Sequence, residues 1–121
     1  MTIQQEKLKL KAKLFRGLGD STRLAILESL KNGEKTASQI VQDVGQSQSN
    51  VSNHLSCLLE CGLVKNRRRG KNTLYTISDK KVSQMLKESD KILSEIAERI
   101  YTCANYDEQK ELVNIKNRDS P

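Results

Sequence analysis

Apolar positions recur at helical spacing over most of the chain and alternate with polar ones over one short stretch. The first four helical blocks end beside glycines, and the blocks after the first begin beside a residue that can cap a helix, such as Asp20, Thr36 or Ser47. Helices are therefore expected at about residues 4–18, 20–31, 36–44, 47–61 and 79–103, and strands at 63–69 and 73–77.

The stretch 46–64 contains a helix with two different halves. Its apolar positions, Val51, Leu55, Leu58 and Leu59, have the spacing of an amphipathic helix. The first half is dense in neutral hydrogen-bonding side chains, and the second half contains the only cysteines of the stretch. Such a helix has one end suited to reading DNA bases and another suited to binding a ligand.

Cys57 and Cys61 lie one helical turn apart. Each residue advances about 100° around an ideal helix, so the two thiols share one face, which is not the centre of the apolar stripe. A disulfide between them is not expected, because side chains one turn apart are too distant. The alternative is that both are small buried hydrophobic residues.

The expected hairpin is strongly basic. Lys65, the run 67–69 and Lys71 place five positive charges in seven residues. A charged hairpin can simply resist edge-to-edge aggregation. Because it directly follows the polar helix, we interpret it as a wing that lies along a phosphate backbone.

The last expected helix has apolar residues at alternating spacings of four and three, from Val82 to Ile100, interrupted by Ser89. This pattern is typical of helix pairing and predicts a homodimer through the N- and C-terminal helices. Residues 1–105 are expected to form one domain, and residues 106–121 a flexible tail.

The composition narrows the class of protein. The chain has 121 residues, a net charge of +6 and a pI of about 9.3, which suits nucleic acid. No segment is apolar enough to span a membrane, and the N-terminus is too charged for a secretion signal, so a cytoplasmic location is expected. With one histidine and no nucleophile motif or phosphate loop, an enzyme is not expected.

Together these elements predict a mainly α-helical fold with a small β-hairpin, the winged helix-turn-helix, which binds double-stranded operator DNA. The expected DNA-binding residues are polar or basic and fall near the third helix, on the fourth helix and in the wing: Thr36, Ser38, Gln46, Ser47, Gln48, Ser49, Asn50, Ser52, Asn53, His54, Arg67, Arg68, Arg69 and Lys71.

The expected metal site consists of Cys57, Cys61 and Cys103, the three thiols of the chain. Cys103 lies at the end of the dimer helix, where it can approach the partner's DNA-binding domain. Three thiolates suit soft metals, while tetrahedral zinc needs a fourth ligand, for which His54 is one candidate.

The segment from Phe15 to Ile77, with LGDSTRLAILESL, SNVSNHLSCLLECGLV and RRRGKNTLYTIS, resembles the ArsR/SmtB family of metal-responsive winged-helix repressors. Its cysteine pattern is similar to that of the cadmium- and lead-sensing branch. The resemblance implies a repressor that is released from DNA when Cd(II) or Pb(II) binds Cys57, Cys61 and Cys103.

Other functions fit the same residues. The thiols could sense arsenite or oxidation instead, and Zn(II) is a further possible ligand; no organic cofactor is expected. A metal-sequestering or scaffolding protein that never binds DNA is a rival of another class. The polar helix and the basic wing argue against this rival.

Overall fold

The computed structural model describes residues 1–97 and residue 99. The elements, in order, are α1 (Ile3–Leu18), α2 (Ser21–Ser29), β1 (Lys35–Thr36), α3 (Ala37–Val44), α4 (Gln48–Glu60), β2 (Val64–Arg69) and β3 (Asn72–Ile77). A last helix follows, from residue 80 to at least residue 97. The chain divides into two compact units, Met1–Gln84 and Met85–Pro121, which are described separately.

The helix boundaries follow local capping chemistry, as the sequence predicts. The side chains of Asp20, Thr36 and Ser47 accept hydrogen bonds from the third residue of α2, α3 and α4. Gly45 ends α3 with a φ of 72°, a left-handed conformation that favours glycine. α2 ends at Ser29 rather than at residue 31, because the chain then tightens into a turn in which the N–H of residue 31 bonds to the carbonyl of residue 28. α4 ends at Glu60, one residue before its predicted end.

A third strand, which the sequence did not predict, joins the hairpin. β1 pairs antiparallel with β3, with Lys35 opposite Tyr75, and the sheet order is β1-β3-β2. Two residues are too short to show any periodicity. An ion pair between Lys35 and Asp43 of α3 holds this strand at the start of the helix-turn-helix.

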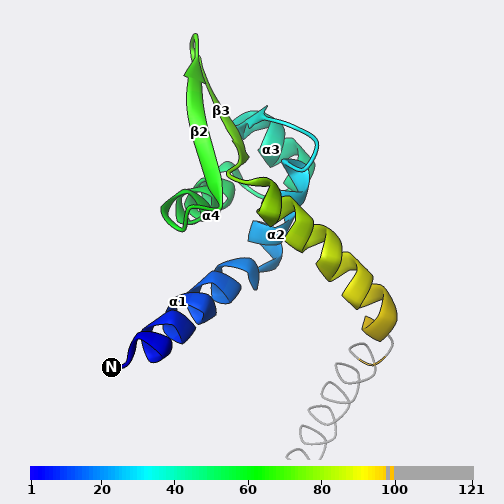
Figure 1. Cartoon of the computed structure of the whole chain (residues 1–121). Helices are drawn as coiled ribbons and strands as arrows, with labels where there is room; N and C mark the ends of the chain where they lie inside the picture. The colour runs from blue at the N-terminus through cyan, green and yellow to red at the C-terminus, as the bar shows by residue number, and fades with distance from the viewer. Residues whose placement is uncertain (98, 100–121) are drawn as a thin grey trace, which may run out of the picture. The chain divides into compact units, whose positions relative to one another are not determined.

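The core of the first unit is aliphatic. Figure 1 shows α2, α3 and α4 gathered at the base of the β2–β3 hairpin, which projects beyond them. The buried side chains come from these three helices, from the residues that directly follow α2 and α4, and from the start of β2: Ile26, Leu27, Leu30, Ile40, Val51, Leu55, Leu58, Leu63 and Val64. The core therefore holds α4 and the hairpin in a fixed arrangement.

The described part of the last helix leaves most of its apolar residues uncovered. Ile92 and Leu93 are 55% and 50% exposed, whereas Leu86 is buried. Leu93 belongs to the predicted dimer seam, and Ile92 lies beside it. Cys103 and the predicted tail 106–121 lie outside the described residues. Within residues 1–97 and 99, no helix is both long and apolar enough to cross a bilayer.

Candidate nucleic-acid interface and thiol groove

The first half of α4 presents its polar side chains to solvent. Val51, Leu55 and Leu58 are buried in the core on the opposite face of the helix. Asn50 is half-buried, and its amide donates a hydrogen bond to Gln46 Oε1 over 3.2 Å. The exposed members of the predicted set are Gln46, Ser47, Gln48, Ser49, Ser52 and Asn53. Their amides and hydroxyls have the donor and acceptor groups needed to read base edges.

The start of α3 offers a second polar surface. Thr36 Oγ1 accepts a hydrogen bond from the N–H of Gln39, and the Gln39 side chain accepts one from the N–H of Thr36. Ser38, in the first turn, is exposed. Hydroxyls and N–H groups at a helix start suit contacts with phosphate oxygens.

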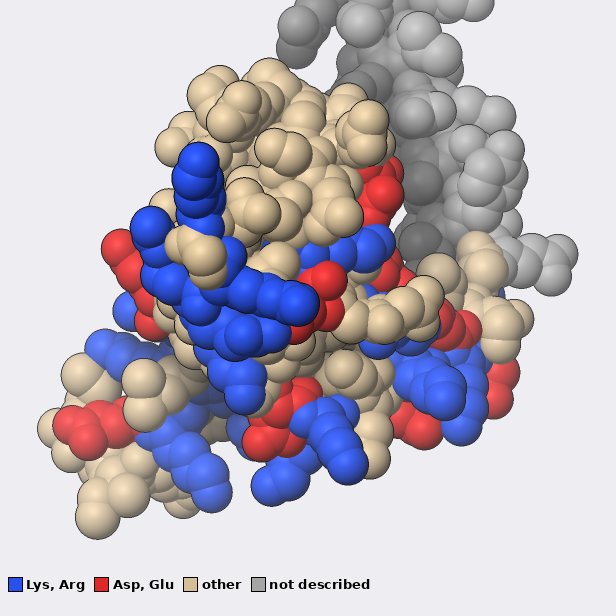
Figure 2. Space-filling model, turned by 90° about the horizontal axis from the view of Figure 1, so that it is seen from above, with Lys and Arg blue, Asp and Glu red and all other residues tan. Residues whose placement is uncertain are grey.

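The wing is basic on both of its faces. Arg67 and Arg69 lie opposite Leu74 and Asn72 of β3, while Arg68 projects to the other face. Lys71 occupies the turn, and all of these cations are exposed. Figure 2 shows Lys and Arg side chains gathered around the hairpin when it is viewed from its tip.

Arg67 differs from the other wing cations because it already has an anionic partner. Its Nε and Nη2 donate to the two carboxylate oxygens of Glu34 over 2.9 and 2.5 Å. The hydrogen bond from Arg67 holds the pKa of Glu34 below its usual value, and Glu34 raises the pKa of Arg67. Arg68 and Lys71 have no such partner among the described residues. The pair with Glu34 therefore uses two of the three guanidinium nitrogens of Arg67 and leaves Nη1 for a phosphate.

His54 faces the start of α2. Its Nδ1 lies 3.3 Å from Arg23 Nη1 and 3.8 Å from Asp20 Oδ1, and the residue is half-buried. Within the described part of the chain, no three His, Cys, Asp or Glu side chains are arranged to hold a metal. His54 therefore does not complete a site with the two thiols of α4, and it fixes α4 against α2 instead.

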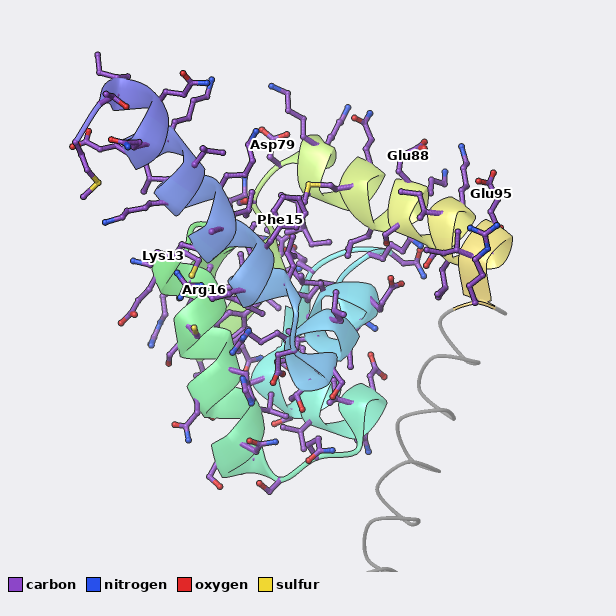
Figure 3. The ribbon with its side chains drawn as sticks, turned by 90° about the horizontal axis from the view of Figure 1, so that it is seen from below. Lys13, Phe15, Arg16, Asp79, Glu88 and Glu95 are labelled. Carbon is purple, nitrogen blue, oxygen red and sulfur yellow. The ribbon has the colours of Figure 1, made fainter. Side chains whose placement is uncertain are left out.

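Cys57 and Cys61 line a groove of about 340 Å³ between α1 and α4. Both thiols are free, Cys57 being half-buried and Cys61 exposed, so the interpretation that they are core residues does not hold. Glu60 lines the same groove from α4, and the α1 wall consists of Leu10, Lys13 and Leu14. Figure 3 shows Lys13 and Arg16 on the side of α1 that faces α4, with Phe15 on another side.

The sulfur of Cys61 is partly covered, although the residue as a whole is exposed. A Cβ added at Gly17 would lie 3.9 Å from Cys61 Sγ, so the backbone of α1 passes close to the thiol. Burial is the main reason why the pKa of Cys61 is raised; Cys57 raises it further, and Lys13 and Arg23 oppose the shift. Two adjacent thiols with an open side can ligate a soft metal.

The sequence interpretation overlooked both the α1 wall and Arg23. The wall has a signal in retrospect, since positions 10, 13, 14 and 17 fall on one face of a helix. Arg23 has none, because a single arginine in a short helix is usually solvated. The third predicted ligand, Cys103, lies outside the described residues, so the structure places two of the three thiols together.

Comparison with known proteins gives a consistent result. Residues 20–66 match the model of a family described as "Bacterial regulatory protein, arsR family". A probable mercury resistance operon repressor of Streptomyces lividans is 44% identical over 75 residues, which is 62% of this chain and 60% of the relative. The regulator CmtR of Mycobacterium tuberculosis is 42% identical over 77 residues, 64% of this chain and 65% of the relative.

The chain thus spans a little under two thirds of the length of these relatives. Among solved structures, a homodimeric winged helix-turn-helix DNA-binding domain from Mycobacterium bovis has a TM-score of 0.73 at 26% identity. That match covers 82% of this chain and 93% of the other. The predicted winged helix-turn-helix fold is confirmed.

Proposed function

Because the chain belongs to the arsR family of bacterial regulatory proteins, we propose that it is a metal-responsive transcriptional repressor. In this proposal it binds operator DNA as a homodimer in the cytoplasm, and Cd(II) or Pb(II) releases it. One observation carries the proposal: α4 presents a polar surface in its first half and two accessible thiols, Cys57 and Cys61, at its end. A ligand at the thiols therefore acts on the element that reads the DNA.

The DNA-binding surface combines three elements. The exposed amides and hydroxyls of α4 supply base contacts, the start of α3 supplies phosphate contacts, and Arg68, Arg69 and Lys71 of the wing supply the positive charge. The net charge of +6 strengthens association with a polyanion. Binding should therefore weaken steeply as salt is raised.

Dimerisation follows from the apolar residues that a single chain leaves exposed. Ile92 and Leu93 of the last helix need a partner surface, and the similar domain from Mycobacterium bovis is described as homodimeric. A two-fold dimer binds a palindromic site with half-sites about one turn of DNA apart. It also allows Cys103 of one chain to approach the thiol groove of the other.

The inducer is expected to be a soft metal ion held by Cys57, Cys61 and Cys103. Thiolates favour soft ions, which supports Cd(II) and Pb(II) over harder ions. One relative is named for mercury resistance, so Hg(II) belongs in the same test. Zn(II) would need a fourth ligand, and His54 is turned away toward Arg23.

A second candidate keeps the DNA-binding role and changes the signal to arsenite or an oxidant. The three thiols suit arsenite as well as they suit cadmium. An oxidation sensor needs a thiolate of lowered pKa, whereas the pKa of Cys61 is raised by burial and by Cys57. The arsenite alternative is therefore stronger than the oxidation alternative.

One release assay distinguishes these signals. Fluorescence anisotropy would follow the full chain bound to a labelled duplex from the region upstream of its own gene. Cd(II), Pb(II), Hg(II), Zn(II), arsenite and peroxide would then be added separately. The proposal expects release by Cd(II) and Pb(II) together with a thiolate-to-metal absorption band. Release by peroxide or arsenite alone would favour the second candidate, and absence of salt-dependent DNA binding would overturn both.

A further inference from the structure

Arg23 joins three helices through one guanidinium group. It lies in the first turn of α2, where Nε donates to the carbonyl of Gly17 over 2.6 Å and Nη2 donates to the carbonyl of Arg16 over 3.0 Å. Its Nη1 lies 3.3 Å from Nδ1 of His54 on α4. The backbone N–H of Arg23 donates to Asp20 Oδ1, which caps α2. The end of α1, the start of α2 and the middle of α4 thus meet at this side chain.

The α1 turn held by Arg23 also borders the thiol groove. Gly17 accepts the shorter of the two hydrogen bonds from Arg23. A Cβ added at Gly17 would lie in van der Waals contact with Cys61 Sγ, at 3.9 Å, so the thiol lies against this part of α1. Gly17 is buried, so this turn has little room to move independently of its neighbours. A displacement of the Cys61 sulfur relative to α1 therefore acts on the peptide that Arg23 binds.

We propose that Arg23 is the positioning residue that couples the thiol groove to the DNA-reading half of α4. The route runs from Cys61 to Gly17, then through the guanidinium to His54, which lies one turn before the thiols on α4. A metal that draws Cys57 and Cys61 toward a third ligand shifts the α1 turn against Arg23. The contact with His54 then changes, and with it the orientation of the polar half of α4. This inference rests on the proposed function.

The competing explanation gives Arg23 only a structural role. A cation that binds the last carbonyls of a helix stabilises that helix end, so loss of Arg23 would simply destabilise α1. Stability alone does not distinguish the two roles. The coupling between metal and DNA does, because it compares two DNA affinities of the same variant.

The test measures DNA affinity with and without saturating Cd(II) for the full chain. Coupling in allosteric proteins spans about 5- to 150-fold, and a value in that range is expected for the wild type. For Arg23→Gln, we expect the ratio of DNA affinity without Cd(II) to that with Cd(II) to fall to about 2 or less. Cd(II) should still bind this variant and give its thiolate absorption band. Arg23→Lys keeps the charge but not the planar fork, so it should behave like Arg23→Gln.

Arg16→Gln is the matched control. Arg16 lies on the side of α1 that faces α4, as Lys13 does (Figure 3). Its side chain has no hydrogen bond or ion pair with the described residues. This variant removes one positive charge from the side of α1 that faces α4 (Figure 3) and should keep the wild-type ratio of DNA affinities. If Arg23→Gln does not fold, His54→Gln tests the far end of the same route, and its Cd(II) ratio should also fall.

The outcomes separate this inference from the proposed function. If wild type does not bind DNA, or is not released by Cd(II), the proposed function fails. If wild type is released and Arg23→Gln or Arg23→Lys keeps the full ratio, the proposed function stands and the role of Arg23 is overturned. An equal loss of the ratio in Arg16→Gln would also overturn it, because charge alone would then explain the effect.

Discussion

Glu34 and Arg67 form a two-point ion pair between the loop before β1 and strand β2, with donor-to-acceptor distances of 2.9 and 2.5 Å. The pair fastens the base of the wing to the segment that leads into α3. It also uses two donor nitrogens of an arginine that the sequence predicts to contact DNA. The wing therefore contains one cation with a structural partner beside others that remain available for phosphate.

Replacing Glu34 by Gln should make DNA binding more dependent on salt. Arg67 would lose its carboxylate partner and become available to a phosphate, and each added phosphate contact steepens the slope of log K against log salt by about 0.9. Anisotropy titrations at several salt concentrations would measure the slope. The matched control is Glu34→Gln with Arg67→Gln, which should return the slope to the wild-type value. An unchanged slope in the single variant would mean that Arg67 does not reach the backbone.

Gly17→Ala should fold and be more stable than the wild type. The added Cβ would lie 3.9 Å from Cys61 Sγ and 4.0 Å from Leu63 Cδ1, which are ordinary contact distances. Alanine inside a helix is favoured over glycine by about 0.5–1 kcal/mol. Urea denaturation of both proteins measures the difference. A loss of stability would show that the backbone of α1 lies closer to α4 than in the described structure.

Protonation of Asp20 should account for part of the loss of stability in acid. The hydrogen bond from the N–H of Arg23 holds the pKa of Asp20 below its ordinary value of 3.8, against an opposing effect of burial. A carboxyl group whose pKa is lowered on folding contributes stability above its unfolded pKa, and that contribution is lost as pH falls through the folded pKa. Asp20→Asn keeps a capping side chain but cannot ionise. As the pH drops below about 4, the urea midpoint of this variant should therefore fall less than that of the wild type. Parallel curves for the two proteins would contradict this assignment.

Alkylation of Cys61 should require a higher pH than alkylation of an ordinary thiol. Burial and the neighbouring Cys57 raise the pKa of Cys61 above 9.0, while Lys13 opposes the shift. Rates of iodoacetamide modification, read by peptide mass spectrometry across a pH series, report the thiolate fraction. Cys57→Ser should move the Cys61 profile to lower pH, and Lys13→Gln should move it higher. Opposite shifts would show that Cys57 and Lys13 do not act on this thiol as described.

Most of the fold could be predicted because its local signals agree. Capping residues such as Thr36 and Ser47 mark where helices begin, and the change to alternating polarity after Gly62 marks the hairpin. β1 could not be predicted, since its two residues are paired only through contact with a strand far along the chain. The end of α2 also depended on a turn that its polarity pattern does not encode.

The candidate site was predictable only in part, for a similar reason. Helical spacing alone predicts that Cys57 and Cys61 lie on one face of the helix. Their groove depends on how α1 packs on α4, and the bridge from Arg23 to His54 depends on where α2 begins in space. The ion pair of Arg67 with Glu34 joins residues 33 positions apart, a separation that periodicity does not reveal.

In the proposed function, the thiols at the end of α4 control DNA binding. The most direct measurement is the Cd(II)-induced change in operator affinity of the Cys57→Ser, Cys61→Ser double variant beside the wild type and Cys103→Ser. We expect that all three proteins bind DNA without metal, that Cd(II) releases the wild type, and that the double variant stays bound. Release of the double variant by Cd(II), at the concentration that releases the wild type, would contradict it.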